Sequence, residues 1–151
     1  VKLEDLLGEI TNSFEAISNK KFIIKSTNNT FNPVVKRKAE LTYGLRNFIG
    51  NASKFSKSLI EIQLKSNEEF TEIKVSDDGP GFPDDIKNFL GEPYIHTKDK
   101  VIDSKSGLGL GTFIGKTLLE RMKADVKFGK CPNNYGAMVS IKWKTNNLTS
   151  I

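Results

Sequence analysis

Apolar residues recur every three or four positions in three stretches of the chain, and this spacing predicts three amphipathic helices. The stretches cover residues 3–18, about 37–56 and 108–123. The core-facing residues of the middle helix are Leu41, Leu45, Phe48, Ala52 and Phe55. Its polar residues Asn47, Asn51 and Lys54 follow the same spacing one position earlier. A polar edge therefore borders the buried face of this helix.

Apolar and polar residues alternate elsewhere, as in strands that bury one face. The predicted strands cover residues 21–25, 59–66, 70–77, 125–129 and 137–144. We expect the second and third to form an antiparallel hairpin around residues 67–69, and the last two to form another. Helices on one side of a mixed, largely antiparallel sheet make an α+β fold, a two-layer sandwich.

The remaining connections are less regular. Residues 28–30 predict a turn, and residues 33–35 a short extended piece. Between Pro80 and Ser106 the pattern breaks into a short helical piece at about 84–90 and a charged stretch, 97–106. Because the charged stretch has almost no apolar anchor, we expect it to be mobile.

Two glycine-rich clusters flank this irregular region. Asp77-Asp78-Gly79-Pro80-Gly81 ends a predicted strand, and Gly107-Leu108-Gly109-Leu110-Gly111 begins a predicted helix. Glycine permits close approach to the backbone, and a helix N-terminus attracts anions, so together the clusters predict a nucleotide pocket. Alone, the first is also typical of an ordinary turn, and the second lacks the spacing of a dinucleotide fold and the lysine of a P-loop.

The candidate chemistry centres on Asn51, Lys54 and Asp77. Mg²⁺ prefers oxygen ligands and usually retains several waters, so the Asn51 amide oxygen and nucleotide phosphates could hold it. Lys54 could balance phosphate charge. Asp77 can accept a hydrogen bond from an exocyclic amine such as that of adenine, and Gly79 and Gly81 leave room for a planar ring. The alternative for the asparagines is a solvated helix edge without a ligand.

Composition and charge narrow the class of protein. With 151 residues, 37% of them hydrophobic, the chain is expected to form one domain, 1–151, with one core. We expect no direct membrane contact, because no run approaches the roughly 18 apolar residues of a membrane span and the N-terminus lacks a signal-peptide pattern. The start at Val1 suggests a piece of a longer protein. The net charge of +5 comes from scattered lysines, so nucleotide phosphates suit it and nucleic acid is not expected.

Cysteine and histidine each occur once. Cys131 has no partner for a disulfide and no companion metal ligands, so we expect it to be inert in a reducing cytoplasm. His96 is expected to be an exposed residue of the irregular region, because one histidine alone builds neither a catalytic triad nor a metal site.

Four motifs occur together in an order and spacing that resemble the catalytic, ATP-binding domain of sensor histidine kinases. They are Asn47-Phe48-Ile49-Gly50-Asn51-Ala52, Asp77-x-Gly79-x-Gly81, Gly107-x-Gly109-x-Gly111 and Gly136-Ala137. The resemblance covers about residues 38–144. Residues 91–94 and 109–121 look like the RegB/PrrB branch of redox-responsive bacterial kinases.

The resemblance implies a fold of the Bergerat (GHKL) ATPase type, with ATP and Mg²⁺ as cofactors. It implies that Asn51 is the Mg²⁺ ligand, that Lys54 contacts phosphate, and that Asp77 reads adenine, with Asn51 and Lys54 as the catalytic residues. Residues 80–106 correspond to the ATP lid. The residues implied to bind the nucleotide are Asn47, Asn51, Lys54, Phe55, Asp77, Gly79, Gly81, Gly107, Leu108, Gly109, Leu110 and Gly111.

The chain departs from related patterns at several positions. ATPases of the chaperone, gyrase and MutL kind carry a glutamate four residues before the metal asparagine, where it activates water. Here that position is Asn47, which favours phosphoryl transfer over hydrolysis. Pro93-Tyr94 replaces the usual phenylalanine-rich lid motif, and Ala137 replaces a frequent threonine. The helix that carries the phosphoacceptor histidine is expected outside this chain.

The expected function is the catalytic domain of a two-component sensor histidine kinase. It would transfer the ATP γ-phosphate to a histidine on a separate dimerisation domain, for relay to the receiver domain of a response regulator, and would not autophosphorylate alone. We expect a cytoplasmic domain of an inner-membrane sensor kinase. Two alternatives share these motifs: a serine kinase of the anti-sigma type, and a nucleotide-sensing module that transfers nothing.

Overall fold

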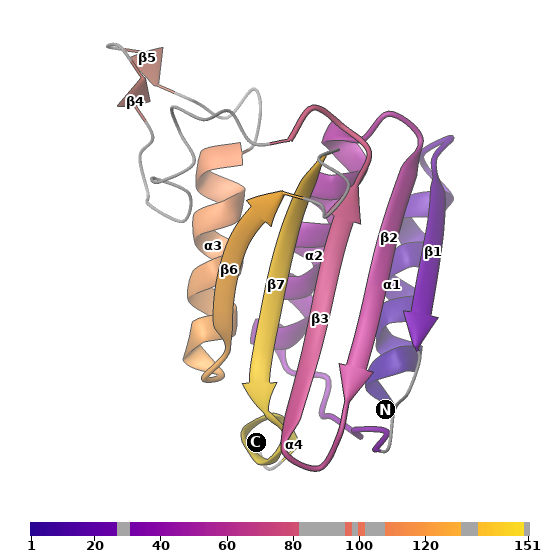
Figure 1. Ribbon diagram of the computed structural model, residues 1–151, viewed down its shortest axis with the longest axis vertical. Coiled ribbons are helices and arrows are strands. Elements are labelled where there is room, and N and C mark those ends of the chain that lie inside the picture. The colour runs from indigo at the N-terminus through magenta and orange to yellow at the C-terminus, as the bar shows by residue number, and fades with distance from the viewer. Residues whose placement is uncertain (27–30, 82–95, 98–99, 102–107, 131–135, 150–151) are drawn as a thin grey trace.

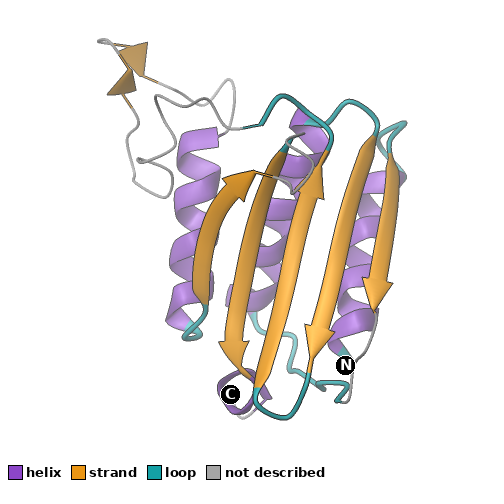
Figure 2. Cartoon of the chain, viewed as in Figure 1, coloured by secondary structure: helices purple, strands orange, loops and turns teal. Residues whose placement is uncertain are grey.

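A five-stranded sheet forms one layer of the molecule, and three long helices pack on one of its faces (Figure 1). Figure 2 shows the two layers, with the strands in front and the long helices behind them. The computed structural model describes residues 1–26, 31–81, 96–97, 100–101, 108–130 and 136–149. The predicted α+β two-layer sandwich is confirmed.

The sheet has a mixed, mostly antiparallel topology. Its strands are β1 (Lys21–Ser26), β2 (Leu59–Ser66), β3 (Phe70–Asp77), β6 (Asp125–Lys130) and β7 (Ala137–Lys144), in the order β1-β2-β3-β7-β6. β1 runs parallel to β2, whereas the other neighbouring pairs are antiparallel. Both predicted hairpins are confirmed. The Asn67 side chain closes the first by accepting hydrogen bonds from the backbone N–H groups of Glu69, at 2.8 Å, and Phe70, at 2.7 Å.

The three long helices confirm the three periodic stretches. They are α1 (Leu3–Glu15), α2 (Ala39–Phe55) and α3 (Leu108–Arg121), each slightly shorter than its sequence pattern. α3 ends where the chain turns at Lys123, which has a positive φ of 67°. Within the described ranges, none of the helices is long and apolar enough to cross a membrane.

Three short elements were not predicted, because they span too few residues to show a periodicity. They are α4 (Thr145–Thr149) and the strands β4 (His96–Thr97) and β5 (Lys100–Val101), which pair antiparallel with each other. The short extended piece at 33–35 is confirmed by a bridge between Lys2 and Val34. The predictions that lie wholly or largely outside the described residues concern the turn at 28–30, the helical piece at 84–90, the mobile stretch at 97–106, and Cys131.

The hydrophobic core lies between the sheet and the helices. Alternate strand residues such as Ile62, Ile73 and Ile141 point inward and are fully buried. They belong to the same cluster as Leu45 and Phe48 on the core face of α2. The other face of the sheet carries half-buried and exposed side chains, which explains the alternating pattern in the sequence.

α2 and α3 pack closely because each has a glycine where the helices meet. A Cβ on Gly44 of α2 would lie 2.6 Å from Cγ of Leu119 in α3. A Cβ on Gly115 of α3 would lie 3.0 Å from the ring of Phe48 and 3.1 Å from Cβ of Asn47. Any larger residue at either position therefore requires a shift of its neighbours. This contact holds α3 against the side of α2 that carries Asn47 and the rest of the polar edge.

Candidate functional site

The polar edge of α2 meets the beginning of α3. The side-chain nitrogen of Asn51 donates a hydrogen bond to Oγ1 of Thr112 at 3.3 Å, and Thr112 is buried. One turn earlier, the side-chain nitrogen of Asn47 donates to the carbonyl of Tyr43 at 2.7 Å. Asn51 thus links the two helices, whereas the amide of Asn47 turns back to its own helix.

The second glycine cluster coincides with the N-terminus of α3. Leu108, Gly109, Leu110 and Gly111 form its first turn, whereas Gly107 lies outside the described residues. The first N–H groups of a helix lack partners within the helix and carry the positive end of its dipole. In Figure 1 this end of α3 lies at the same edge of the molecule as the end of β3 and the end of α2. Anion binding by these residues stays a prediction.

Asp77 is the last residue of β3 and is buried, with 9% of its surface exposed. Its Oδ1 accepts hydrogen bonds from the backbone N–H groups of Gly79, at 2.8 Å, and Ala137, at 3.4 Å. Burial raises the pKa of the Asp77 carboxyl above its ordinary value, and the charge of Asp78 acts in the same direction. The two hydrogen bonds and the positive charge of Lys20 oppose this rise in pKa.

Glycines lie around Asp77 because neighbouring backbone segments approach each other there too closely to leave room for a Cβ atom. A Cβ on Gly79 would lie 2.2 Å from the carbonyl oxygen of Phe55, the last residue of α2. Gly136 has a φ of +66°, and its Cβ would lie 1.8 Å from the carbonyl oxygen of Asp77. Gly81 has a φ of +81° and packs against the Gly136 backbone. The first glycine cluster therefore joins the end of β3 to the end of α2.

The C-terminal end of α2 carries Lys54 and Phe55. Nζ of Lys54 lies 5.4 Å from the centre of the Phe55 ring, a cation–π distance. The carbonyl groups of this last turn accept hydrogen bonds from the ammonium group of Lys20, at 2.8 Å for Ser56 and 3.4 Å for Lys54. Both predicted residues thus lie on the helix end that Gly79 contacts.

Asp78, next to Asp77, has a structural role that the sequence did not reveal. Its carboxylate accepts hydrogen bonds from the backbone N–H of Lys57 at 2.8 Å, and from the backbone N–H and hydroxyl of Ser58 at 3.1 and 3.0 Å. Burial alone would raise the pKa of Asp78, but these bonds and one from Leu59 lower it to about 2. Asp78 therefore anchors the end of β3 to the connection between α2 and β2.

The structure brings the predicted residues together in two groups that share the last turns of α2. Asn51 is joined to the start of α3 through Thr112. Asp77 is joined to Phe55 through the close approach of Gly79. In the described ranges, no group of three or more His, Cys, Asp or Glu residues is arranged to hold a metal ion. The side chain of His96 lies outside the described residues.

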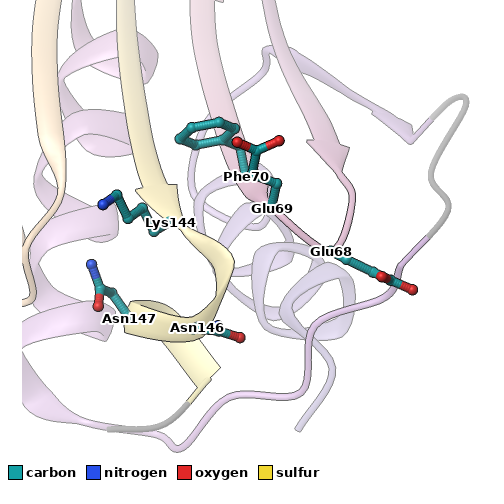
Figure 3. A pocket seen from close by; sticks show the side chains of 6 residues that line it. All are labelled: Glu68, Glu69, Phe70, Lys144, Asn146 and Asn147. Atoms are coloured by element: carbon teal, nitrogen blue, oxygen red, sulfur yellow. The ribbon is translucent and has the colours of Figure 1, made fainter.

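A pocket of about 540 Å³ lies at the opposite end of the sheet (Figure 3). It is lined by residues of the β2–β3 turn, the start of β3, the end of β7 and α4, namely Glu68, Glu69, Phe70, Lys144, Asn146 and Asn147. None of the predicted nucleotide-binding residues lines it. The candidate site is therefore the edge formed by α2, β3 and α3, and not this pocket.

Sequence patterns missed three residues that shape the site: Lys20, Asp78 and Thr112. Lys20 and Asp78 act on residues far away in the chain, so no local spacing marks them. Thr112 was missed because the apolar positions that predicted its helix, Leu110, Phe113, Ile114, Thr117 and Leu118, do not include it. The structure instead buries Thr112, Gly115 and Leu119 and leaves Ile114 exposed. Periodicity therefore predicted this helix correctly but not the face that it buries.

Comparisons with known proteins show the family to which the chain is related. Residues 37–147 match the family described as "Histidine kinase-, DNA gyrase B-, and HSP90-like ATPase". The chain is 33% identical over 135 residues to the sensor histidine kinase RegB of Cereibacter sphaeroides. This match covers 79% of the chain and 29% of RegB. It is 28% identical over 92 residues to the sensor histidine kinase CpxA of Escherichia coli, covering 61% of the chain and 20% of CpxA. The chain thus spans less than a third of either relative.

Two solved structures share the fold. The mycobacterial sensor histidine kinase MprB has a TM-score of 0.76 at 16% identity, covering 95% of this chain and 96% of that one. The nucleotide-free catalytic domain of the histidine kinase ThkA has a TM-score of 0.75 at 19% identity, covering 96% and 94%. At these identities the likeness concerns the fold alone.

Proposed function

Because the chain belongs to the histidine kinase-, DNA gyrase B- and HSP90-like ATPase family, we propose that it is the catalytic, ATP-binding domain of a sensor histidine kinase. It transfers the γ-phosphoryl group of ATP to a histidine on a separate dimerisation domain. From this histidine the phosphoryl group passes to a response regulator. One observation carries the proposal: the last turns of α2 connect the start of α3, through Asn51 and Thr112, with the buried carboxylate of Asp77.

Asp77 recognises the adenine base in this proposal. A carboxylate held by backbone N–H groups at a strand end is a fixed acceptor for the exocyclic amine of adenine. Gly79 and Gly81 leave the neighbouring backbone bare, and the half-buried ring of Phe55 at the end of α2 flanks the base. Guanine carries a carbonyl where adenine carries this amine, so Asp77 sets the preference for ATP over GTP.

In this proposal the nucleotide phosphates are bound by Asn51, Lys54 and the glycine cluster Gly107–Gly111. The donor set suits Mg²⁺, which binds through few protein oxygens together with substrate phosphates, and a carboxylate cluster is not required. Asn51 would hold the ion through its amide oxygen, and the ion would neutralise charge on the phosphates. Lys54 adds a positive charge, and the N-terminus of α3 adds backbone N–H donors.

The chemistry depends on positioning and electrostatics, because phosphoryl transfer needs an aligned acceptor more than it needs a covalent step by the enzyme. Asn47 stands where a carboxylate base would activate water, and its amide is hydrogen-bonded to the Tyr43 carbonyl. The site therefore favours transfer to a protein histidine over hydrolysis. The whole chain acts as one domain, with residues 80–106 as its lid, on the cytoplasmic side of an inner-membrane parent kinase.

Transfer of label between separate chains tests this function. The chain is mixed with [γ-³²P]ATP, Mg²⁺ and the dimerisation segment of its parent protein, and the label on that segment is tested for acid lability. Acid-labile label that disappears when the acceptor histidine is replaced by glutamine supports the proposal. Acid-stable label on a serine identifies a serine kinase instead, and bound ATP without any transfer identifies a nucleotide-sensing module.

A further inference from the structure

Lys20 lies in the connection between α1 and β1, before the segment 37–147 that matches the ATPase family. Its ammonium group donates hydrogen bonds to the carbonyl oxygens of Ser53, Ser56 (2.8 Å) and Lys54 (3.4 Å). All three acceptors belong to the C-terminal end of α2. A single side chain therefore reaches from another part of the chain to the helix that carries the proposed phosphate-side residues.

The last carbonyl groups of a helix lack partners within the helix and carry the negative end of its dipole. Many helices satisfy them with a glycine in the left-handed conformation. α2 has no such cap, because Ser56 is extended, with φ −70° and ψ 160°. A lysine ammonium has three N–H donors, and Lys20 directs one toward each of three carbonyls. Lys20 thus caps α2 from a distance.

The remaining carbonyl of this turn has a different neighbour. The carbonyl oxygen of Phe55 faces Gly79, whose absent side chain allows the two backbones to touch. The last turn of α2 is therefore held between Lys20 and the chain that follows Asp77. Movement of this turn would displace Lys54 and Phe55 relative to Asp77.

The charge of Lys20 also acts on Asp77. Two charged groups affect this carboxyl: Asp78 raises its pKa and Lys20 lowers it. The groups that reach Asp77 from other elements include the backbone N–H of Ala137 in β7. Since burial favours the protonated acid, Lys20 helps to keep Asp77 ionised, and an ionised carboxylate is a stronger hydrogen-bond acceptor than the neutral acid.

We infer that Lys20 is a positioning residue of the nucleotide site: its three hydrogen bonds fix the last turn of α2 against the strand end at Asp77. The inference rests on the proposed function and extends it to a residue outside the family match. It makes adenine nucleotide affinity depend on a side chain that need not touch the nucleotide.

The first test uses the chain without nucleotide. Lys20→Met removes the charge and donors, Lys20→Arg retains both, and Lys21→Met removes a neighbouring exposed charge as a control. We expect Lys20→Met to raise the Asp77 pKa in a ¹³C carboxyl titration and to speed exchange of the Ser56 amide, which bonds to the Ala52 carbonyl at 3.0 Å. Lys20→Arg should retain most of the wild-type behaviour, and Lys21→Met all of it.

The second test measures Mg-ATP affinity by calorimetry between pH 5 and pH 8. Loss of the cap should weaken binding roughly tenfold in Lys20→Met. The loss should be larger at pH 5, because more Asp77 is protonated there, and Lys20→Arg should largely restore binding. If Lys20→Met is unfolded by circular dichroism, Lys20→Gln takes its place.

The outcomes distinguish a failure of the positioning role of Lys20 from a failure of the proposed function. A wild type that binds ATP, with a folded Lys20→Met variant that binds equally well at every pH, overturns the role of Lys20 alone. Unchanged Asp77 titration and Ser56 exchange in that variant overturn it as well. A wild type that binds no adenine nucleotide overturns the proposed function, and the nucleotide role of Lys20 with it.

Discussion

Asp77 and Asp78 are neighbours whose carboxylates have opposite surroundings. Burial raises the pKa of Asp77, whereas hydrogen bonds lower that of Asp78 to about 2. A carboxyl with a raised pKa destabilises the fold when it ionises, and one with a lowered pKa stabilises it. In the proposed function, Asp77 therefore serves nucleotide binding at the expense of stability, whereas its neighbour Asp78 contributes to stability.

Asp77→Asn separates these two properties. The amide oxygen of asparagine can still accept the N–H groups of Gly79 and Ala137, and no buried charge remains, so we expect equal or greater stability at pH 7. Any gain should shrink as the pH falls through the raised pKa and vanish only below the ordinary Asp pKa near 4, where the carboxyl is neutral in the folded and the unfolded state alike. The preference for ATP over GTP should fall roughly tenfold. Thermal unfolding and calorimetry with both nucleotides measure the two effects, and an unaltered preference contradicts the adenine assignment.

Asp78→Asn should destabilise the fold and leave nucleotide preference intact. The ionised Asp78 contributes stability above its ordinary pKa near 4, and this contribution is lost as the pH falls through about 2. Because Asp78 is partly exposed, we expect a deficit of about 1 kcal/mol at pH 7 that shrinks between pH 4 and pH 2. Urea unfolding at several pH values measures it. Asp125→Asn is the control, since the ion pair that Asp125 forms with Lys127, at 3.6 Å, is exposed.

Asn51→Asp tests the proposed role of Asn51 in binding Mg²⁺ next to the nucleotide phosphates. A carboxylate adds negative charge next to the triphosphate, so Mg-ATP affinity should fall by roughly tenfold or more in calorimetry. Thr112→Val removes only the hydrogen-bond partner of Asn51 and should weaken binding less. Equal affinity of wild type and Asn51→Asp would argue against Asn51 as the metal ligand.

At the scale of elements, the contact between α2 and α3 depends on Gly44. An alanine Cβ there would lie 2.6 Å from Cγ of Leu119, so Gly44→Ala should destabilise the fold by about 1–3 kcal/mol in urea unfolding. Gly8→Ala in α1 is the matched control, because nothing lies within 4 Å of its Cβ. Helix propensity alone should make that variant more stable by about 0.5–1 kcal/mol. If both variants gain stability, the glycine at the helix contact is not required.

Periodicity predicted each long helix and each of the five strands, because burying one face requires a period near 3.6 or 2. It did not predict that β1 pairs in parallel with β2, since alternation shows which face is buried and not which strand lies next to it. The residues of the candidate site likewise fall into those that local patterns could predict and those that they could not. Asn51 and Asp77 stand in local patterns, whereas Lys20 acts on a carbonyl 36 positions away.

At the scale of the whole molecule, one core cluster includes residues of α1, α2, α3 and the strands. The single tryptophan, Trp143 in β7, is 1% exposed within that cluster. Its fluorescence emission should therefore shift to the red on unfolding. The urea transition followed in this way should coincide with that followed by circular dichroism. Two separate transitions would mean that the layers unfold independently.

The edge strand β1 has a practical consequence. The segment shared with the ATPase family begins at residue 37, whereas β1 and α1 precede it. A fragment trimmed to the family boundary would leave the backbone of β2 unpaired along one side and would remove α1, whose buried residues Leu7 and Ile10 belong to the core. Exposed strand edges template aggregation. Anyone who expresses this domain should therefore retain its first thirty-odd residues.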